Sequence, residues 1–142
     1  MRGGRLRGDN KMNEKAKQKR ILLVDDNANV LAVLSDFLKS AGYTVREAKD
    51  AQGAIEVVKE KLPNLALIDL RMPGMDGINL MLSLKKTKPH LPVIIYSGYP
   101  SMNTAIEALK NGADDYLTKP FFLDGLKTST DQVFNKHTSS RL

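Results

Sequence analysis

The stretch Ile21-Leu22-Leu23-Val24-Asp25-Asp26 sets the pattern of the whole chain, because an unbroken apolar run ends abruptly in acidic side chains. Three later, mainly apolar runs likewise end at a polar side chain: residues 65–68 at Asp69, residues 93–96 at Ser97 and residues 116–118 at Lys119. Such runs, separated by helix-length segments, are typical of parallel strands buried on both faces. The carboxyl ends of parallel strands meet at one edge of the sheet, where open α/β folds bind ligands. The sequence therefore predicts a single site at that edge.

The predicted edge gathers carboxylate, hydroxyl and ammonium groups, which come from Asp25, Asp26, Asp69, Ser97 and Lys119. Neighbouring carboxylates repel one another, so a cluster of this kind is costly unless a cation occupies it. Carboxylate oxygens are ligands that suit Mg²⁺. The residues alone therefore predict a magnesium pocket with polar groups that can hold phosphate.

Segments with helical periodicity separate the strands, and cap or turn residues delimit them. The predicted helices cover residues 27–41, 50–63, 76–84, 101–111 and 123–134, a further strand covers residues 43–48, and a polar connection covers residues 85–92. Five strands that alternate with five helices over roughly 115 residues predict a doubly wound α/β sandwich.

The net charge of +6 arises at the start of the chain. Residues 1–20 carry eight Lys or Arg against two acidic residues, whereas the basic and acidic residues of the remainder balance. The first stretch has almost no apolar residues, so we interpret residues 1–19 as a disordered basic leader. Residues 20–137 then form one domain, and residues 138–142 are expected to fray. The alternative for the leader is an electrostatic arm, and nucleic acid is not expected to bind through the domain itself.

The composition gives no sign of export or of membrane insertion. The longest uninterrupted apolar stretch, residues 30–34, is far shorter than the ~18 residues that a membrane span needs. The leader lacks the apolar core of a signal peptide. The chain contains no cysteine, which excludes disulfides and Cys-based zinc sites. We therefore expect a cytoplasmic protein with no membrane partner.

Three motifs carry a resemblance to a known family. They are residues 22–26 (LLVDD), 66–77 (ALIDLRMPGMDG) and 112–121 (GADDYLTKPF). In this order and at this spacing they closely resemble the receiver domain of two-component response regulators, over residues 20–135. The resemblance implies a flavodoxin-like α/β fold, in which a doubly wound, five-stranded parallel sheet is covered by five helices.

The resemblance also implies which residues accept phosphate and bind metal. Asp69 would accept a phosphoryl group from a phosphohistidine on a sensor histidine kinase or a phosphotransfer protein. Mg²⁺ would be the cofactor, bound by Asp25, Asp26, Asp69 and the backbone carbonyl of Arg71. Asp69 follows a buried strand, so its carboxylate has a rigid base from which to act as the nucleophile.

The remaining roles concern the phosphoryl oxygens and the response to them. The resemblance implies that Lys119 and Ser97 hold the phosphoryl group. Ser97 and Tyr116 would then act as switch residues and change a surface, from residue 101 to residue 111 together with Tyr116 and the last helix, that a downstream effector binds. A homodimer is compatible with this family. The chain would be a phosphoacceptor signalling domain rather than an enzyme with external substrates.

Two other functions stay open at this point. Hydrolases of the haloacid dehalogenase type also form an aspartyl phosphate, but they need a second aspartate two places after the nucleophile, and Arg71 stands at that distance from Asp69. The missing acid argues against this interpretation. A receiver that serves only as an unphosphorylated interaction scaffold is the other alternative. The sequence fits either a stand-alone regulator, which we favour, or a receiver from a longer protein.

Overall fold

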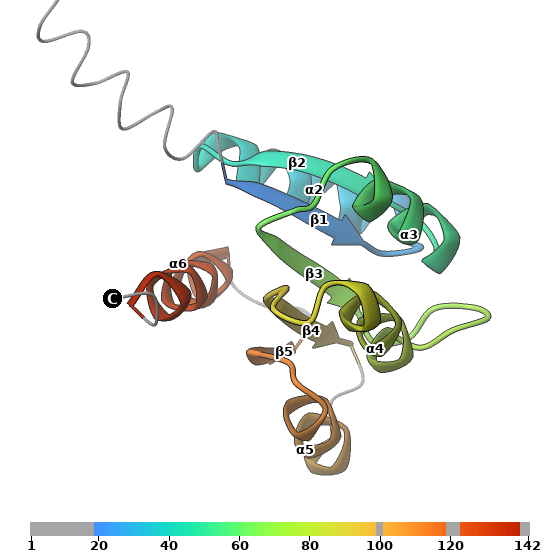
Figure 1. Ribbon diagram of the computed structural model, residues 1–142. Helices are drawn as coiled ribbons and strands as arrows, with labels where there is room; N and C mark the ends of the chain where they lie inside the picture. The colour runs from blue at the N-terminus through green and yellow to red at the C-terminus, as the bar shows by residue number, and fades with distance from the viewer. Residues whose placement is uncertain (1–18, 99–100, 119–122, 140–142) are drawn as a thin grey trace, which may run out of the picture.

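The computed structural model describes residues 19–98, 101–118 and 123–139. In these ranges strands and helices alternate (Figure 1). The strands are β1 (Arg20–Val24), β2 (Thr44–Ala48), β3 (Leu65–Asp69), β4 (Val93–Ser97) and β5 (Asp115–Thr118). The helices are α2 (Ala28–Ser40), α3 (Ala51–Glu60), α4 (Gly77–Thr87), α5 (Met102–Lys110) and α6 (Leu123–Ser139). None of these helices has the length and apolar character that crossing a membrane requires.

The strands form one parallel sheet in the order β2-β1-β3-β4-β5. The chain runs outward from β1 to β2 and then crosses to the other side of β1 to form β3. The strand order therefore reverses between β1 and β3, and doubly wound sheets bind ligands at the carboxyl ends of the strands at such a point. The five-stranded parallel α/β fold expected from the sequence is confirmed.

Alternate residues of the central strands point to opposite faces of the sheet. Ile21 and Leu23 of β1 belong to a core with α2 and α6, whereas Leu22 and Val24 belong to a core with α3, α4 and α5. Figure 1 shows these helices on the two sides of the sheet. Every residue of β3 and β4 is buried. Two of the strands that end at the predicted site, β3 and β4, are thus fixed by packing on both faces.

Polar caps begin the helices where the sequence predicts them. Asp50, Asp76 and Ser101 accept hydrogen bonds from backbone N–H groups in the first turns of α3, α4 and α5, and Asn27 does so for α2. Ser101 and Thr104 also form a reciprocal capping box at the start of α5. Such caps are each worth about 1 kcal/mol because they satisfy N–H groups that the helix leaves unpaired.

Three helix ends differ from the expectation. α3 ends at Glu60 rather than at Pro63, because residues ahead of a proline favour extended backbone. α4 continues to Thr87, three residues into the predicted connection, because its lysines are good helix formers. α6 extends to Ser139 and so includes positions for which we expected fraying.

Helix α5 packs less tightly than its apolar residues predict. Ala108 is its one buried residue, whereas Met102, Ile106 and Leu109 are 75%, 48% and 50% exposed. The helix covers β5, which is an edge strand, so only a narrow strip of the helix finds a partner. A row of apolar side chains is therefore left on the surface of the molecule.

Gly77 lies where α4 begins, against the backbone of β3. A Cβ atom at this position would be 2.4 Å from the Asp69 carbonyl oxygen and 2.9 Å from the Cα atom of Leu70. Gly77→Ala should therefore lower the free energy of unfolding by about 2–3 kcal/mol, because the backbone that carries the site has to move. Urea denaturation of the purified variant measures this change.

Gly125→Ala is the matched control for Gly77→Ala. Gly125 is exposed on α6, and an added Cβ atom would have no atom within 4 Å. Alanine favours a helix over glycine by roughly 0.5–1 kcal/mol, so this variant should be neutral or more stable than the wild type. A Gly77→Ala protein as stable as the wild type would contradict the close approach of α4 to β3.

Candidate functional site

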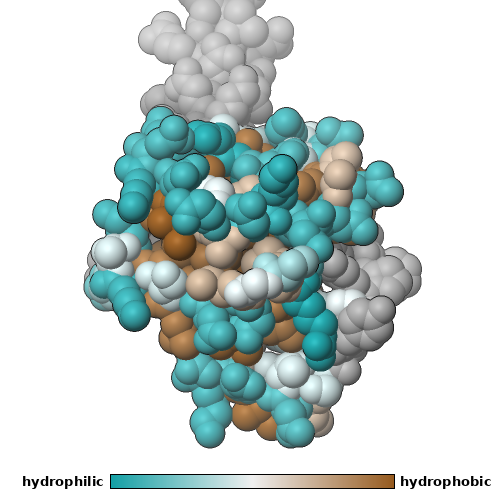
Figure 2. All heavy atoms as spheres, turned by 90° about the vertical axis from the view of Figure 1, so that its right-hand side faces the viewer, coloured by the Kyte–Doolittle hydropathy of each residue, from teal (hydrophilic) through white to brown (hydrophobic). Residues whose placement is uncertain are grey.

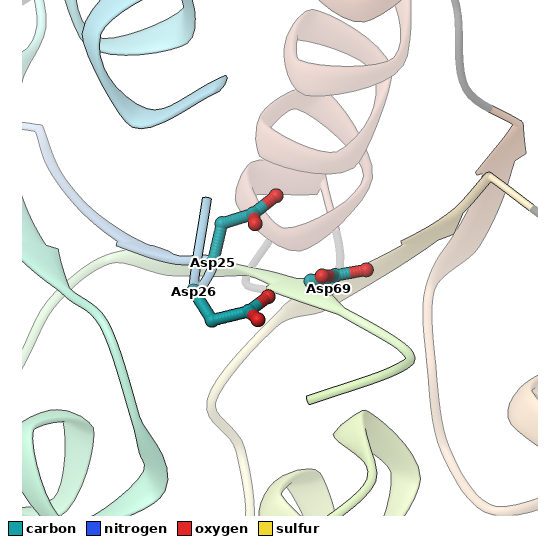
Figure 3. Close-up of side chains that lie close together, drawn as sticks. All are labelled: Asp25, Asp26 and Asp69. Atoms are coloured by element: carbon teal, nitrogen blue, oxygen red, sulfur yellow. The ribbon is translucent and has the colours of Figure 1, made fainter. Parts of the chain in front are cut away.

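Three carboxylates meet at the carboxyl edge of the sheet and form what we call the acidic cluster: Asp25, Asp26 and Asp69. Asp25 and Asp26 directly follow β1, and Asp69 is the last residue of β3. One carboxylate oxygen from each residue lies within 4.8 Å of the other two. Figure 3 shows the Asp25 and Asp26 side chains close together and the Asp69 side chain on the neighbouring strand. Asp25 and Asp69 are buried, whereas Asp26 is exposed.

Both oxygens of the Asp25 carboxylate accept a hydrogen bond from the protein. The backbone N–H of Asn27 donates to Oδ1 at 2.8 Å, and the hydroxyl of Tyr96 donates to Oδ2 at 2.7 Å. The backbone N–H of Asp25 donates to the carbonyl of Ala48 at 3.1 Å, which extends the pairing of β1 with β2 beyond the strand. The carboxylate is therefore held at both of its oxygens, and the backbone of Asp25 is held against β2.

Asp69 is held in place by backbone hydrogen bonds at and next to it, which involve β4, the start of α4 and the loop after β3. Its neighbour Leu70 donates its N–H to the carbonyl of Tyr96 at 2.8 Å and accepts from the N–H of Gly77 at 2.6 Å. The N–H of Arg71 donates to Oδ1 of Asp69 at 3.4 Å. Asp69 therefore presents a carboxylate at the edge of the sheet from a backbone that has little freedom to move.

The structure places some of the other predicted site residues at this edge. Ser97 is the last residue of β4, is buried, and lies opposite Thr118 of β5 in the sheet. Arg71 follows β3 and has an exposed side chain. Lys119, which the sequence predicts to complete the pocket, lies outside the described residues. Five of the six residues expected around the phosphoryl group and the metal are thus positioned by β1, β3 and β4 or by the loops after them.

Tyr116 lies on β5, away from the acidic cluster, and is partly buried against the core beneath α5. Its hydroxyl shares a hydrogen bond of 3.0 Å with the hydroxyl of Thr104. Thr104 is also the residue that closes the capping box of α5 with Ser101. The predicted switch residue is therefore connected to the first turn of the helix that carries the exposed apolar row.

One residue of the site, Tyr96, is not predicted from the sequence. The apolar pattern of residues 93–96 places it in a buried strand, but its hydroxyl reaches Asp25. Burial raises the pKa of the Tyr96 hydroxyl far above its ordinary value, and the adjacent Asp25 carboxylate raises it further. The available signal was the residue type, because a buried tyrosine in an otherwise aliphatic strand needs a partner for its hydroxyl.

Comparisons with known proteins agree with this fold. The family model of the response regulator receiver domain matches residues 21–131. The transcriptional regulatory protein ZraR of Escherichia coli (strain K12) is 41% identical over 120 residues, which cover 84% of this chain and 27% of ZraR.

Two solved structures are similar in the same region. NtrX from Brucella abortus has a TM-score of 0.82 at 31% identity, over 86% of this chain and 28% of that one. A response regulator receiver domain protein from Clostridium thermocellum has a TM-score of 0.80 at 28% identity, over 84% of this chain and 97% of that one.

This chain spans about a quarter of the length of ZraR and of NtrX. It spans nearly all of the Clostridium protein. The matched part of the longer proteins is thus the part that corresponds to a receiver domain. The five-stranded parallel sheet, the acidic cluster at its carboxyl edge and the family match lead to one conclusion: this chain belongs to the family of response regulator receiver domains.

Proposed function

We propose that this chain is a phosphorylation switch in which Asp69 takes a phosphoryl group from a phosphohistidine on a sensor histidine kinase or a phosphotransfer protein. The observation that carries the proposal is the convergence of Asp25, Asp26 and Asp69, whose oxygens lie within 4.8 Å of one another. Asp69 is the natural nucleophile of the three, because it ends a fully buried strand and its carboxylate lies at the edge of the sheet.

The acidic cluster fits Mg²⁺, because its donors are all oxygen atoms and its charge of three carboxylates needs a cation. Asp26 and Asp69 would be the direct ligands, together with the backbone carbonyl of Arg71. Asp25 would act partly through water, since each of its oxygens already accepts a hydrogen bond. When bound, Mg²⁺ supplies positive charge against the phosphoryl oxygens.

The chemical step joins an Asp69 oxygen to phosphorus as the bond from phosphorus to the donor imidazole nitrogen breaks. The electron pair of that bond returns to the nitrogen. The Ser97 hydroxyl is suited to donate to one phosphoryl oxygen, and Lys119 would contribute a point charge to another. The residues of the chain thereby position the acceptor and the phosphoryl oxygens, which is the main requirement for phosphoryl transfer.

The response would travel through Ser97 and Tyr116. Movement of Ser97 toward the phosphoryl group would leave room for Tyr116 to turn inward, and this turn would give up the hydrogen bond to Thr104. The start of α5 would then lose its contact with β5. The surface that changes includes the apolar row of Met102, Ile106 and Leu109.

Helix α5 lies at the bottom of Figure 2, where hydrophobic residues emerge between hydrophilic ones. An effector protein or domain that binds this apolar row is the partner we propose, and it can read the switch directly because the row adjoins Tyr116 and Thr104. ZraR is a transcriptional regulatory protein, so an output of that type is one form this partner can take.

The basic leader, residues 1–19, has no role in the switch as proposed, and the cytoplasm is the expected compartment.

Phosphorylation of Asp69 is tested with acetyl phosphate as a donor. The wild type should gain the mass of one phosphoryl group in the presence of Mg²⁺, and should gain none when a chelator is added. Asp69→Asn should gain none in either condition, because an amide is a far weaker nucleophile than a carboxylate. Intact-protein mass spectrometry measures the change, and a phosphorylated Asp69→Asn protein would contradict the assignment.

Repulsion within the acidic cluster predicts an unusual stability pattern. Without metal, Asp69→Asn should raise the free energy of unfolding by about 1–2 kcal/mol, because it removes one of three adjacent charges. Mg²⁺ should stabilise the wild type strongly and the variant weakly, since a ligand that binds only the folded state stabilises it. Urea denaturation with chelator and with Mg²⁺ measures both effects.

The control for this comparison is Asp36→Asn, which removes an exposed carboxylate from α2. It should change the unfolding free energy by less than about 0.5 kcal/mol and leave the effect of Mg²⁺ intact. A loss of stability in metal-free Asp69→Asn, or a Mg²⁺ effect as large as that of the wild type, would count against the acidic cluster as a metal site.

The hydrogen bond between Tyr116 and Thr104 predicts the direction in which the switch is biased. Tyr116→Phe removes this bond and should favour the inward orientation by about 0.5–1.5 kcal/mol. The affinity for beryllofluoride, which mimics the phosphoryl group, should then rise about 2- to 10-fold. Thr104→Ser keeps the hydroxyl and should match the wild type. Equal or weaker beryllofluoride binding by Tyr116→Phe would exclude the bond as a restraint on the switch.

A further inference from the structure

Tyr96 connects the two strands that carry the acidic cluster. It lies on β4, opposite Asp69 in the register of β3 and β4, and its side chain is fully buried. The ring belongs to the core with α2 and α6, and the hydroxyl reaches past β3 to the end of β1. There it approaches the Val24 carbonyl at 3.2 Å and Oδ2 of Asp25 at 2.7 Å. Its own carbonyl accepts from the N–H of Leu70, next to Asp69.

A tyrosine hydroxyl has a single proton, so it makes one strong donor bond. The shorter distance and the negative charge of the carboxylate place that bond on Asp25. If the buried hydroxyl needed only a hydrogen-bond acceptor, the carbonyl of Val24 would be sufficient. The terminal torsion of an aspartate is broad, so a carboxylate held at one oxygen can still rotate. With Asn27 on Oδ1 and Tyr96 on Oδ2, the Asp25 carboxylate is held at both oxygens.

We propose that Tyr96 is a positioning residue for the divalent cation and that it acts through Asp25. Its hydroxyl holds the Asp25 carboxylate in the orientation that keeps one oxygen within 4.8 Å of those of Asp26 and Asp69. The inference rests on the proposed function in that it takes the acidic cluster to be the Mg²⁺ site. Side chains that hydrogen-bond to metal ligands commonly set the orientation of those ligands, and their removal weakens metal binding about 10- to 100-fold. Tyr96 differs from an ordinary core residue because its hydroxyl bonds one cluster strand and its backbone bonds the other.

The test compares Tyr96→Phe with Tyr43→Phe. Each variant removes one hydroxyl that donates to a carboxylate and keeps the aromatic ring. The Tyr43 hydroxyl donates to Oδ1 of Asp131 at 3.0 Å, beside the amino end of β2 and so at the opposite edge of the sheet. Mg²⁺ binding is measured by isothermal titration calorimetry without any phosphoryl donor. Tyr96→Phe should bind Mg²⁺ about 10-fold more weakly than the wild type. Tyr43→Phe should bind within about twofold of it.

A purely structural role for Tyr96 gives a different pattern. It predicts that Tyr96→Phe unfolds more easily with and without Mg²⁺ and keeps the wild-type dissociation constant, and this result would overturn the inference while leaving the proposed function intact. Weakening of similar size in Tyr43→Phe would overturn it as well. A wild type that binds no Mg²⁺ would refute the metal site of the proposed function and the inference together.

A second measurement needs only the wild-type fold and keeps the inference testable if Tyr96→Phe does not fold. In a protein with labelled tyrosine rings and labelled backbone amides, saturation with Mg²⁺ should shift the NMR signals of Tyr96, because its hydroxyl donates to a carboxylate of the site. The signals of Tyr43 should stay in place. Tyr96 signals that do not move while those of the Asp69 backbone do would overturn the inference.

Discussion

Three carboxylates lie within 4.8 Å of one another at the ends of β1 and β3, and their mutual repulsion is the electrostatic problem around which the site is built. Like charges this close disfavour the folded state unless packing, hydrogen bonds or a cation compensate. The fold supplies the first two. β3 is buried along its length, and the Asp25 carboxylate accepts from Asn27 and Tyr96. Packing and hydrogen bonds thus keep the three carboxylates together in the folded state, in a position where they can bind a cation.

The same constraint explains how a small chemical change can alter a distant surface. A phosphoryl group on Asp69 would add negative charge at an edge of the sheet that packing holds in place. Only the less tightly packed groups near this edge could then change their positions. Ser97 ends β4 at this edge, and Tyr116 is only partly buried and bonds Thr104 in the first turn of α5. α5 itself packs on the sheet mainly through Ala108. In the proposed switch, the rigid part of the domain would carry out the phosphoryl transfer, and the lightly packed helix α5 would change the surface that a partner binds.

Much of the fold could be predicted because local features specify it. Apolar runs mark the buried strands, and Asp50, Asp76 and Ser101 begin helices where capping side chains are expected. The convergence of Asp25, Asp26 and Asp69 also followed, since parallel strands end at the same edge. The exposure of Ile106 and Leu109 did not follow, because periodicity finds an apolar stripe without showing how much of it a neighbour covers. The hydrogen bond from Tyr96 to Asp25 could not be predicted either, because it joins residues 71 positions apart and local sequence patterns do not show which distant side chains meet.

In the proposed function, Asp69 alone among the clustered carboxylates becomes phosphorylated. Treating the phosphorylated protein with borohydride reduces an aspartyl phosphate to homoserine, and peptide mass spectrometry then locates the change. We expect homoserine at position 69 and unmodified aspartate at positions 25 and 26. Homoserine at either of those positions, or a phosphoryl group that resists borohydride and maps to Ser97, would contradict it.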